Sequence, residues 1–222
     1  MKTILIALLF VSTIAFSQVN QISNLQDVYT LKNDIELNAD YNDPNVKGSP
    51  FLHAEYQNIK IKGVEMKGRY NANRDYIEVD NKGEIIFFVP SVVNRYDVLF
   101  TDTNETYRAF EYESLKFGFF KVLAKKDKAF LLTKQVIQFR PEVKPKNNFE
   151  TLKAAQFERK KDAHFIKLSN QDILIELPTR KSKFLNVFTS NQNAIKSYIK
   201  KEKLNIKKEE DLIKIFNYYS SL

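Results

Sequence analysis

Between residues 56 and 139, short apolar or alternating segments recur about every 8 to 12 residues, and polar turn residues separate them. This spacing is typical of a β-meander, in which consecutive strands pair as antiparallel neighbours. Two of the turns, Lys62-Gly63 and Asp80 to Gly83, contain glycine, which adopts positive φ without steric cost. The pattern predicts strands at Tyr56–Ile61, Val64–Tyr70, Tyr76–Val79, Glu84–Val89, Tyr96–Phe100, Tyr107–Tyr112, Phe117–Ala124 and Ala129–Phe139.

Three later segments complete the predicted sheet region. Residues 85–89 are apolar at every position, whereas apolar and polar residues alternate in a strand with one solvent-exposed face. We therefore expect this strand in the centre of the sheet with both faces covered. A further hairpin is predicted from residues 165–168 and 173–177, in which Ile173, Ile175 and Leu177 share a face. Between the meander and this hairpin, the polar residues 141–148 contain two prolines and predict a long surface loop inside one domain.

After residue 178 the apolar period changes from two to 3.6, which indicates helices. The carboxylates of residues 209–211 fall in the first turn of the last helix, where they oppose the positive end of the helix dipole. Short helices depend on burying an apolar face, so we expect them to pack on the sheet. The three predicted apolar faces are Phe184, Leu185 and Phe188; Ile195, Tyr198 and Ile199; and Leu212, Ile213, Phe216 and Tyr219.

These patterns together predict an α+β fold, an antiparallel β-meander with C-terminal helices packed on it. The meander is expected to form a curved sheet, a sandwich or a partial barrel. The expected organisation is a signal peptide at 1–17, an N-terminal segment at 18–50, a β-rich domain at 51–178, and a helical cap at 179–222 that belongs to the same domain. A mature chain of roughly 200 residues can bury its core without disulfides or a cofactor.

The first residues have the three regions of a cleavable secretory signal, namely Lys2, the apolar run Ile4 to Phe16, and small residues at Ala15 and Ser17. A spanning helix needs about 20 apolar residues, so we expect cleavage before Gln18 and no transmembrane helix in the mature chain. The chain has no cysteine, which excludes disulfides, thiolate zinc sites and a lipid on an N-terminal cysteine. The predicted location is outside the cytoplasm, as a periplasmic, outer-membrane-associated or released protein.

Basic residues are concentrated towards the end of the chain. The formal net charge is +8, and residues 150–222 hold 15 Lys and Arg against 9 Asp and Glu. Lysine outnumbers arginine by 28 to 7, and arginine is the residue favoured for phosphate and base contacts, so no nucleic-acid partner is expected. The densest basic patch is interpreted either as a docking surface for an acidic protein or anionic lipid, or as a solvated helix face. Its residues are Lys200, Lys201, Lys203, Lys207 and Lys208.

Few residue patterns suggest a catalytic or metal-binding site. His53 and Glu55 would share a face of an extended strand, as an acid–base pair requires, but any exposed strand face produces this spacing. Asp40 and Asp43 offer oxygen ligands for calcium without the spacing of a calcium loop, so a turn is the preferred interpretation. His164 is interpreted as part of a solvated strand edge. We therefore expect no catalytic, cofactor or metal site.

Three parts of the sequence form a recognisable combination. They are the leader ending Ala15-Phe16-Ser17-Gln18, the block Gly48-Ser49-Pro50-Phe51-Leu52 followed by Arg69-Tyr70-Asn71 and Asp75-Tyr76-Ile77-Glu78, and the ending at residues 204–219. In this combination the chain resembles uncharacterised exported proteins of the Bacteroidota. The resemblance implies a periplasmic or outer-membrane-associated location, and it implies no activity or site residue.

The expected function is non-enzymatic binding of another macromolecule in the cell envelope, with a protein as the preferred partner and an anionic surface as the second choice. Two alternatives stay open. In the first, the meander curls into a barrel around an apolar cavity and carries a small ligand. In the second, the protein is a hydrolase whose site no motif reveals. A large continuous cavity would favour the carrier, and convergent polar groups with shifted pKa would favour the enzyme.

Overall fold

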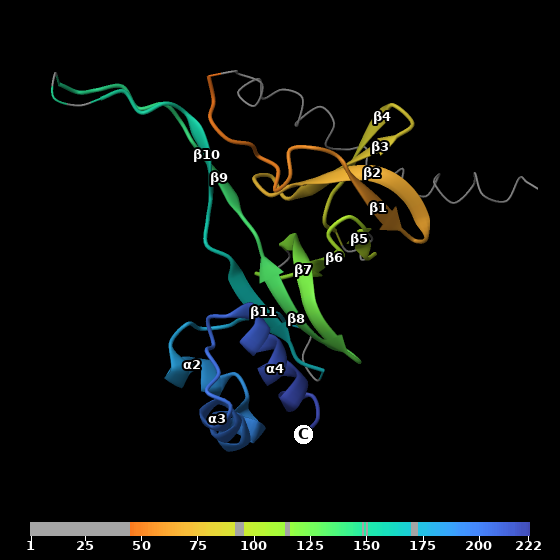
Figure 1. The fold of residues 1–222 in the computed structure, drawn as a ribbon, viewed down its shortest axis with the longest axis vertical. Coiled ribbons are helices and arrows are strands. Elements are labelled where there is room, and N and C mark those ends of the chain that lie inside the picture. Colours follow the sequence, from red (N-terminus) through yellow and green to blue (C-terminus); the bar gives the residue numbers. More distant parts are fainter. Residues whose placement is uncertain (1–44, 92–95, 114–115, 148, 150, 170–172) are drawn as a thin grey trace, which may run out of the picture.

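The computed structural model describes residues 45–91, 96–113, 116–147, 149, 151–169 and 173–222. Within these residues, antiparallel strands form a ten-stranded sheet in the order β12-β11-β8-β7-β6-β5-β1-β2-β3-β4, and β9 and β10 form a two-stranded ribbon (Figure 1). The predicted α+β fold, an antiparallel meander with C-terminal helices, is confirmed. The strands are β1 (Gln57–Ile61), β2 (Val64–Asn71), β3 (Tyr76–Asn81), β4 (Glu84–Phe88), β5 (Val98–Phe100), β6 (Glu105–Glu111), β7 (Phe117–Lys126), β8 (Ala129–Lys134), β9 (Ile137–Arg140), β10 (Gln156–Arg159), β11 (Ala163–Lys167) and β12 (Ile175–Glu176).

Two-residue turns fix the register of the β1–β2 and β3–β4 hairpins. Lys62 and Gly63 join β1 to β2 with φ values of 50° and 84°, and Lys82 and Gly83 join β3 to β4 with 57° and 93°. Turns with positive φ at both central residues match the right-handed twist of the flanking strands. Glycine at the second position adopts this conformation without a steric penalty, so the sequence determines where these hairpins fold.

The strands β1 to β7 curl around the first hydrophobic core, and we call this part of the sheet the curl. The ring of Phe88 on β4 stacks on that of Phe119 on β7, with centroids 5.6 Å apart, although five strands separate β4 from β7 in the sheet order. The rings of Tyr70 and Tyr107 lie 5.1 Å apart in the same core, to which Ile137 of β9 also belongs. The sheet therefore bends until its β4 edge faces its middle.

The apolar segment 85–89 lies at the edge of the sheet, so the prediction that it is a central strand is wrong. Both of its faces are nevertheless covered. Phe88 points into the curl and is 1% exposed, while the ring of Phe87, on the opposite face, packs edge-on against Tyr76 with centroids 5.2 Å apart. Curling covers the inner face of an edge strand, which is why a continuous apolar run does not require a central position.

Three helices, α2 (Lys181–Asn186), α3 (Gln192–Lys201) and α4 (Glu209–Tyr219), form a cap on the opposite end of the sheet from the curl (Figure 1). Their buried residues and those of β8 and β11 form a second core, in which Ile195 and Phe216 are at most 1% exposed. The predicted helical faces are confirmed, except that Ile215 rather than Ile213 is the buried isoleucine of α4. The predicted carboxylates occupy the first turn of α4.

The predicted second hairpin also forms, from β11 and β12, and Ile175 and Leu177 pack into the second core. Ile173 is 73% exposed, so the prediction that it shares their buried face is wrong. The strand β12 has only two residues, and the period-two pattern does not extend back to position 173.

The segment predicted as one strand at 129–139 is divided into two. β8 stays in the sheet, whereas β9 leaves it and pairs with β10, a strand that the sequence did not predict. A bridge between Val143 and Lys153 extends this ribbon, so the proline-containing stretch lies near the tip of a projecting arm (Figure 1). We call residues 137–159 the arm. Its base is fixed to the curl because Ile137 donates its amide hydrogen to Ala72 and accepts a hydrogen bond from the Asn73 side chain.

Candidate functional site

The five lysines of the predicted docking patch follow one another from the end of α3 to the start of α4, and all five are exposed. Lys201 lies 3.7 Å from the carboxylate of Glu202, and Lys207 lines a pocket described below. The geometry therefore exposes the whole patch to solvent.

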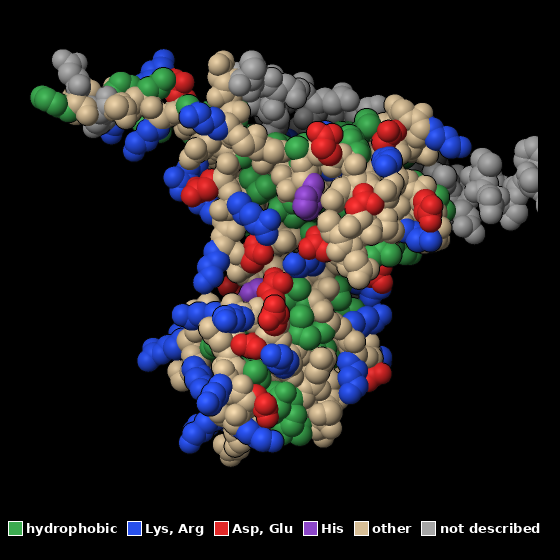
Figure 2. All heavy atoms as spheres, in the orientation of Figure 1, with side chains coloured by type: hydrophobic (Ala, Val, Ile, Leu, Met, Phe, Trp, Pro, Cys, Tyr) green, Lys and Arg blue, Asp and Glu red, His purple; other side chains and the backbone are tan. Residues whose placement is uncertain are grey.

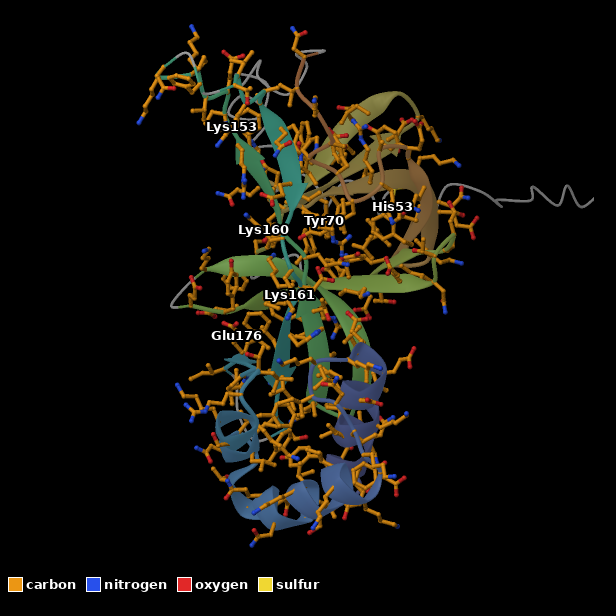
Figure 3. The ribbon with its side chains drawn as sticks, turned by 60° about the vertical axis from the view of Figure 1, so that its left-hand side comes forward. His53, Tyr70, Lys153, Lys160, Lys161 and Glu176 are labelled. Carbon is orange, nitrogen blue, oxygen red and sulfur yellow. The ribbon has the colours of Figure 1, made fainter. Side chains whose placement is uncertain are left out.

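The residues singled out as an acid–base pair do not form one. His53 and Glu55 lie in a bend before β1 instead of in a strand, and both are exposed (Figure 3). Among the described residues, no hydrogen bond joins their side chains. Asp40 and Asp43 lie outside the described residues. In the described part of the chain, no group of three or more histidine, cysteine or acidic side chains could hold a metal ion.

The arm carries exposed apolar side chains, which is unusual for a polar segment. Phe149 is 98% exposed, Leu152 is 57% exposed and Val143 is 49% exposed. Lys144 and Lys153 on the same arm are exposed as well, and Figure 2 shows basic side chains gathered along the projection. The sequence alone did not reveal this surface, because the prolines pointed to a loop and the projecting ribbon depends on the unpredicted strand β10.

A row of polar residues crosses the sheet between the two cores. Tyr107, Lys121, Thr133 and His164 lie directly opposite one another on β6, β7, β8 and β11, so their side chains share one face. On that face, Phe119 of the first core lies on one side of the row, and the second core lies on the other side. We call these four residues the polar row. Figure 2 shows a narrowing of the molecule, the waist, where carboxylates and a histidine gather.

Two glutamates complete the polar row. The ammonium group of Lys121 lies 3.4 Å from Glu105 and 3.5 Å from Glu209, the first residue of α4. The hydroxyl of Thr133 lies 3.3 Å from Glu209 and 3.0 Å from Nδ1 of His164. These contacts join the helical cap to the sheet through charges.

Hydrogen-bond chemistry selects one tautomer for His164. The carboxylate of Glu209 only accepts, so Thr133 satisfies both contacts when its hydroxyl donates to Glu209 and its oxygen accepts Nδ1–H of His164. Nε2 then carries a lone pair. Burial lowers the pKa of His164, and the charges of Glu209 and Asp162 only partly oppose this effect. His164 is thus neutral near pH 7 and half-buried, so its interpretation as a solvated strand edge is wrong.

A pocket of about 220 Å³ opens beside His164 at the waist. Three chain segments line it: the connection into β11, the end of β12 with the residues that follow, and the loop before α4. Figure 3 shows Lys161 and Glu176 at this waist, below the arm that carries Lys153. The lining residues are Lys161, Asp162, Ala163, His164, Glu176, Leu177, Thr179, Ile206 and Lys207.

A second polar network lies inside the curl. Lys134 donates hydrogen bonds to Asp75, at 2.5 Å, and to the carbonyl oxygen of Phe119, at 2.9 Å. Asp75 also accepts a hydrogen bond of 2.6 Å from the hydroxyl of Tyr70. Burial lowers the pKa of Lys134 and raises that of Tyr70, and the charge of Asp75 adds to the second shift. Since these groups satisfy one another between β2, β7 and β8, we interpret the network as structural.

The blocks 48–52, 69–71 and 75–78, separate in the sequence, meet on the outer face of the curl. Phe51 bridges to Asn71, and the guanidinium of Arg69 lies 3.7 Å from the centre of the Phe51 ring. Arg69 donates a 2.6 Å hydrogen bond to Glu78, which also accepts one from Tyr56. Burial, with the charge of Glu78, raises the pKa of Tyr56 to about 12. We therefore interpret these residues as structural, since they fix the segment before β1 to β2 and β3.

Comparisons with protein-family models, curated proteins and solved structures find no match for this chain. The resemblance to exported proteins of the Bacteroidota accordingly stays a prediction. Among the described residues, no helix has the length and apolar character needed to cross a membrane.

Proposed function

We propose that this protein is exported to the cell envelope and binds another protein there through its arm, without catalysing a reaction. The observation that carries the proposal is the projecting two-stranded arm with Phe149 almost fully exposed near its tip. Burying one phenylalanine side chain at an interface contributes roughly 1.5 to 3 kcal/mol. Leu152 and Val143 on the same arm add to the apolar area available for contact.

Backbone hydrogen bonds hold the base of the arm, which favours binding because less conformational freedom is lost on association. Lys47 pairs with β10, donating its amide hydrogen to Ala155 and accepting one from Phe157. On the other strand, Ile137 is hydrogen-bonded to the curl. An apolar anchor surrounded by lysines fits a partner surface with an apolar pocket and an acidic rim.

The carrier alternative receives less support, because side chains occupy the inside of the curl. Tyr70, Ile77, Phe88 and Phe119 are each at most 3% exposed there and pack against one another in one core. The hydrolase alternative is weakened at the polar row, since Thr133 is fully buried and a substrate cannot reach its hydroxyl. Neither observation opposes binding through the arm.

A site-specific photocrosslinker tests the proposal in intact cells. Placed at Phe149, it should yield a discrete crosslinked protein partner that survives stringent purification. The matched control places the same group at Ile173, an exposed apolar residue just before β12, which belongs to the main sheet and not to the arm. Equal crosslinks from both positions, or none from Phe149, would contradict the proposal. If Phe149 crosslinks only lipid, and the protein sediments with anionic vesicles, the partner is a membrane surface and the protein-binding proposal is wrong.

A further inference from the structure

The waist pocket is a second place at which this protein can hold a ligand, and it is independent of the arm. Its volume of about 220 Å³ equals that of roughly seven liquid waters, enough for a small organic acid or a phosphate group. Leu177 and Ile206 provide an apolar part of the wall, while Lys161 and Lys207 provide cationic groups. A mixed lining of this kind suits a ligand with one charged end and a short apolar part.

The charges on the pocket favour an anion. Among the described residues, neither Lys161 nor Lys207 forms an ion pair, so both ammonium groups are available. Asp162 is already engaged by Arg159, at 3.1 Å. Glu176 lies opposite Phe165 in the β11–β12 pairing, and its side chain therefore leaves the sheet on the other face from His164. The positive groups are thus the ones left without partners on the side of His164.

His164 adds an imidazole nitrogen to the lysine charges of the pocket. Its Nδ1 is held by Thr133, whereas Nε2 has no hydrogen-bond partner among the described residues. A histidine whose second nitrogen is held by a hydroxyl, with a carboxylate behind that hydroxyl, has a defined ring orientation. It is therefore prepared to accept a proton and then donate a hydrogen bond to a ligand oxygen.

We propose that the waist pocket binds a small oxyanion, a carboxylate or a phosphate group, between Lys161, Lys207 and Nε2 of His164. Any short apolar part of the ligand packs on Leu177 and Ile206. Binding takes up one proton at Nε2, because the anion stabilises the charged imidazolium. The pocket is unrelated to the arm, so either proposal can fail without the other.

The linked proton uptake predicts the direction in which ligand affinity changes with pH. Nearby charges act on His164 in opposite directions: Glu209 from α4 and Asp162 from its own segment favour the imidazolium, while Lys121 from β7 and Lys161 oppose it. Burial outweighs the two carboxylates and keeps the pKa of His164 below its usual value in the free protein. A bound anion raises that pKa, so affinity for a carboxylate should increase as the pH falls from about 8 to 6.

Proton NMR of the mature protein tests the proposal directly, because the chain has only two histidines and the exposed His53 serves as an internal control. Butyrate and inorganic phosphate are titrated separately at constant ionic strength. At least one of them should shift the His164 ring signal saturably and raise its pKa, while the His53 signal stays unchanged. The ligand that saturates identifies the source of the oxyanion, and the pH dependence is measured with butyrate because phosphate itself titrates in this range.

Single substitutions locate the anion. Lys161→Gln and Lys207→Gln should each weaken binding by about threefold to fivefold, and Lys201→Gln, at the C-terminal end of α3 and outside the pocket, should not. Equal shifts of both histidines, or no saturation with either ligand, would overturn the proposal. So would wild-type affinity in both pocket variants.

Discussion

Replacing Phe216 with alanine tests whether the helical cap is an integral part of the folded domain. Phe216 is 1% exposed and belongs to the second core, which also contains Leu131 and Ile166 from the sheet and Ile195 from α3. Phenylalanine to alanine changes in such cores cost about 3 to 5 kcal/mol, because both buried area and packing are lost. For a chain of this size each kcal/mol lowers Tm by about 2 to 4 °C, so Tm should fall by about 6 to 20 °C.

Thermal unfolding of the mature protein, followed by circular dichroism, measures this change. The matched control is Phe149→Ala, the same substitution at a side chain that is 98% exposed, which should change stability by no more than about 0.5 kcal/mol. Strands and helices of the Phe216→Ala variant should still unfold in one transition. A Tm within about 2 °C of the parent, or rapid amide exchange throughout α4 in the parent, would refute the reasoning.

Two further outcomes are expected. The intact mass of the protein from its native host should correspond to a chain that begins at Gln18, and a retained Met1 would contradict cleavage of the leader. If the docking patch binds an acidic protein or an anionic surface, reversing four of its exposed lysines to glutamate should weaken envelope association at low salt and leave Tm unchanged, because exposed charges contribute little to stability. A variant that fractionates like its parent would identify the patch as a solvated helix face. The four are Lys200, Lys201, Lys207 and Lys208.

Helices and strands could be predicted from the sequence wherever a local rule determines the backbone conformation. Lys62-Gly63 and Lys82-Gly83 specify tight hairpins, and the apolar period of α4 specifies its buried face. Prediction was wrong where the three-dimensional course of the sheet mattered. The position of the segment 85–89 depends on the curl, and the division of 129–139 into β8 and β9 depends on a partner strand about twenty residues away.

The candidate sites were largely hidden for the same reason. The lysine patch is contiguous in the sequence, so composition alone could find it. The polar row joins residues from four strands, and its existence depends on pairings such as Lys121 with Thr133 and Thr133 with His164. One local signal was present: Lys121 interrupts the apolar run of β7 between residues 119 and 124, and Thr133 follows the apolar run of β8 at residues 129–132.

The polar side chains of Lys121 and Thr133 within these strands have a physical consequence for both proposed sites. An inward-facing lysine or threonine is unfavourable in a continuous apolar core unless partners satisfy it. In this fold Glu105 and Glu209 supply those partners for Lys121, and the row consequently lies between the two cores. Just beyond the row, β8 and β11 give way to β9 and β10, which leave the sheet as the arm. The polar row thus marks both the wall of the pocket and the point from which the arm projects, although the residues proposed to bind ligands at the two places are different.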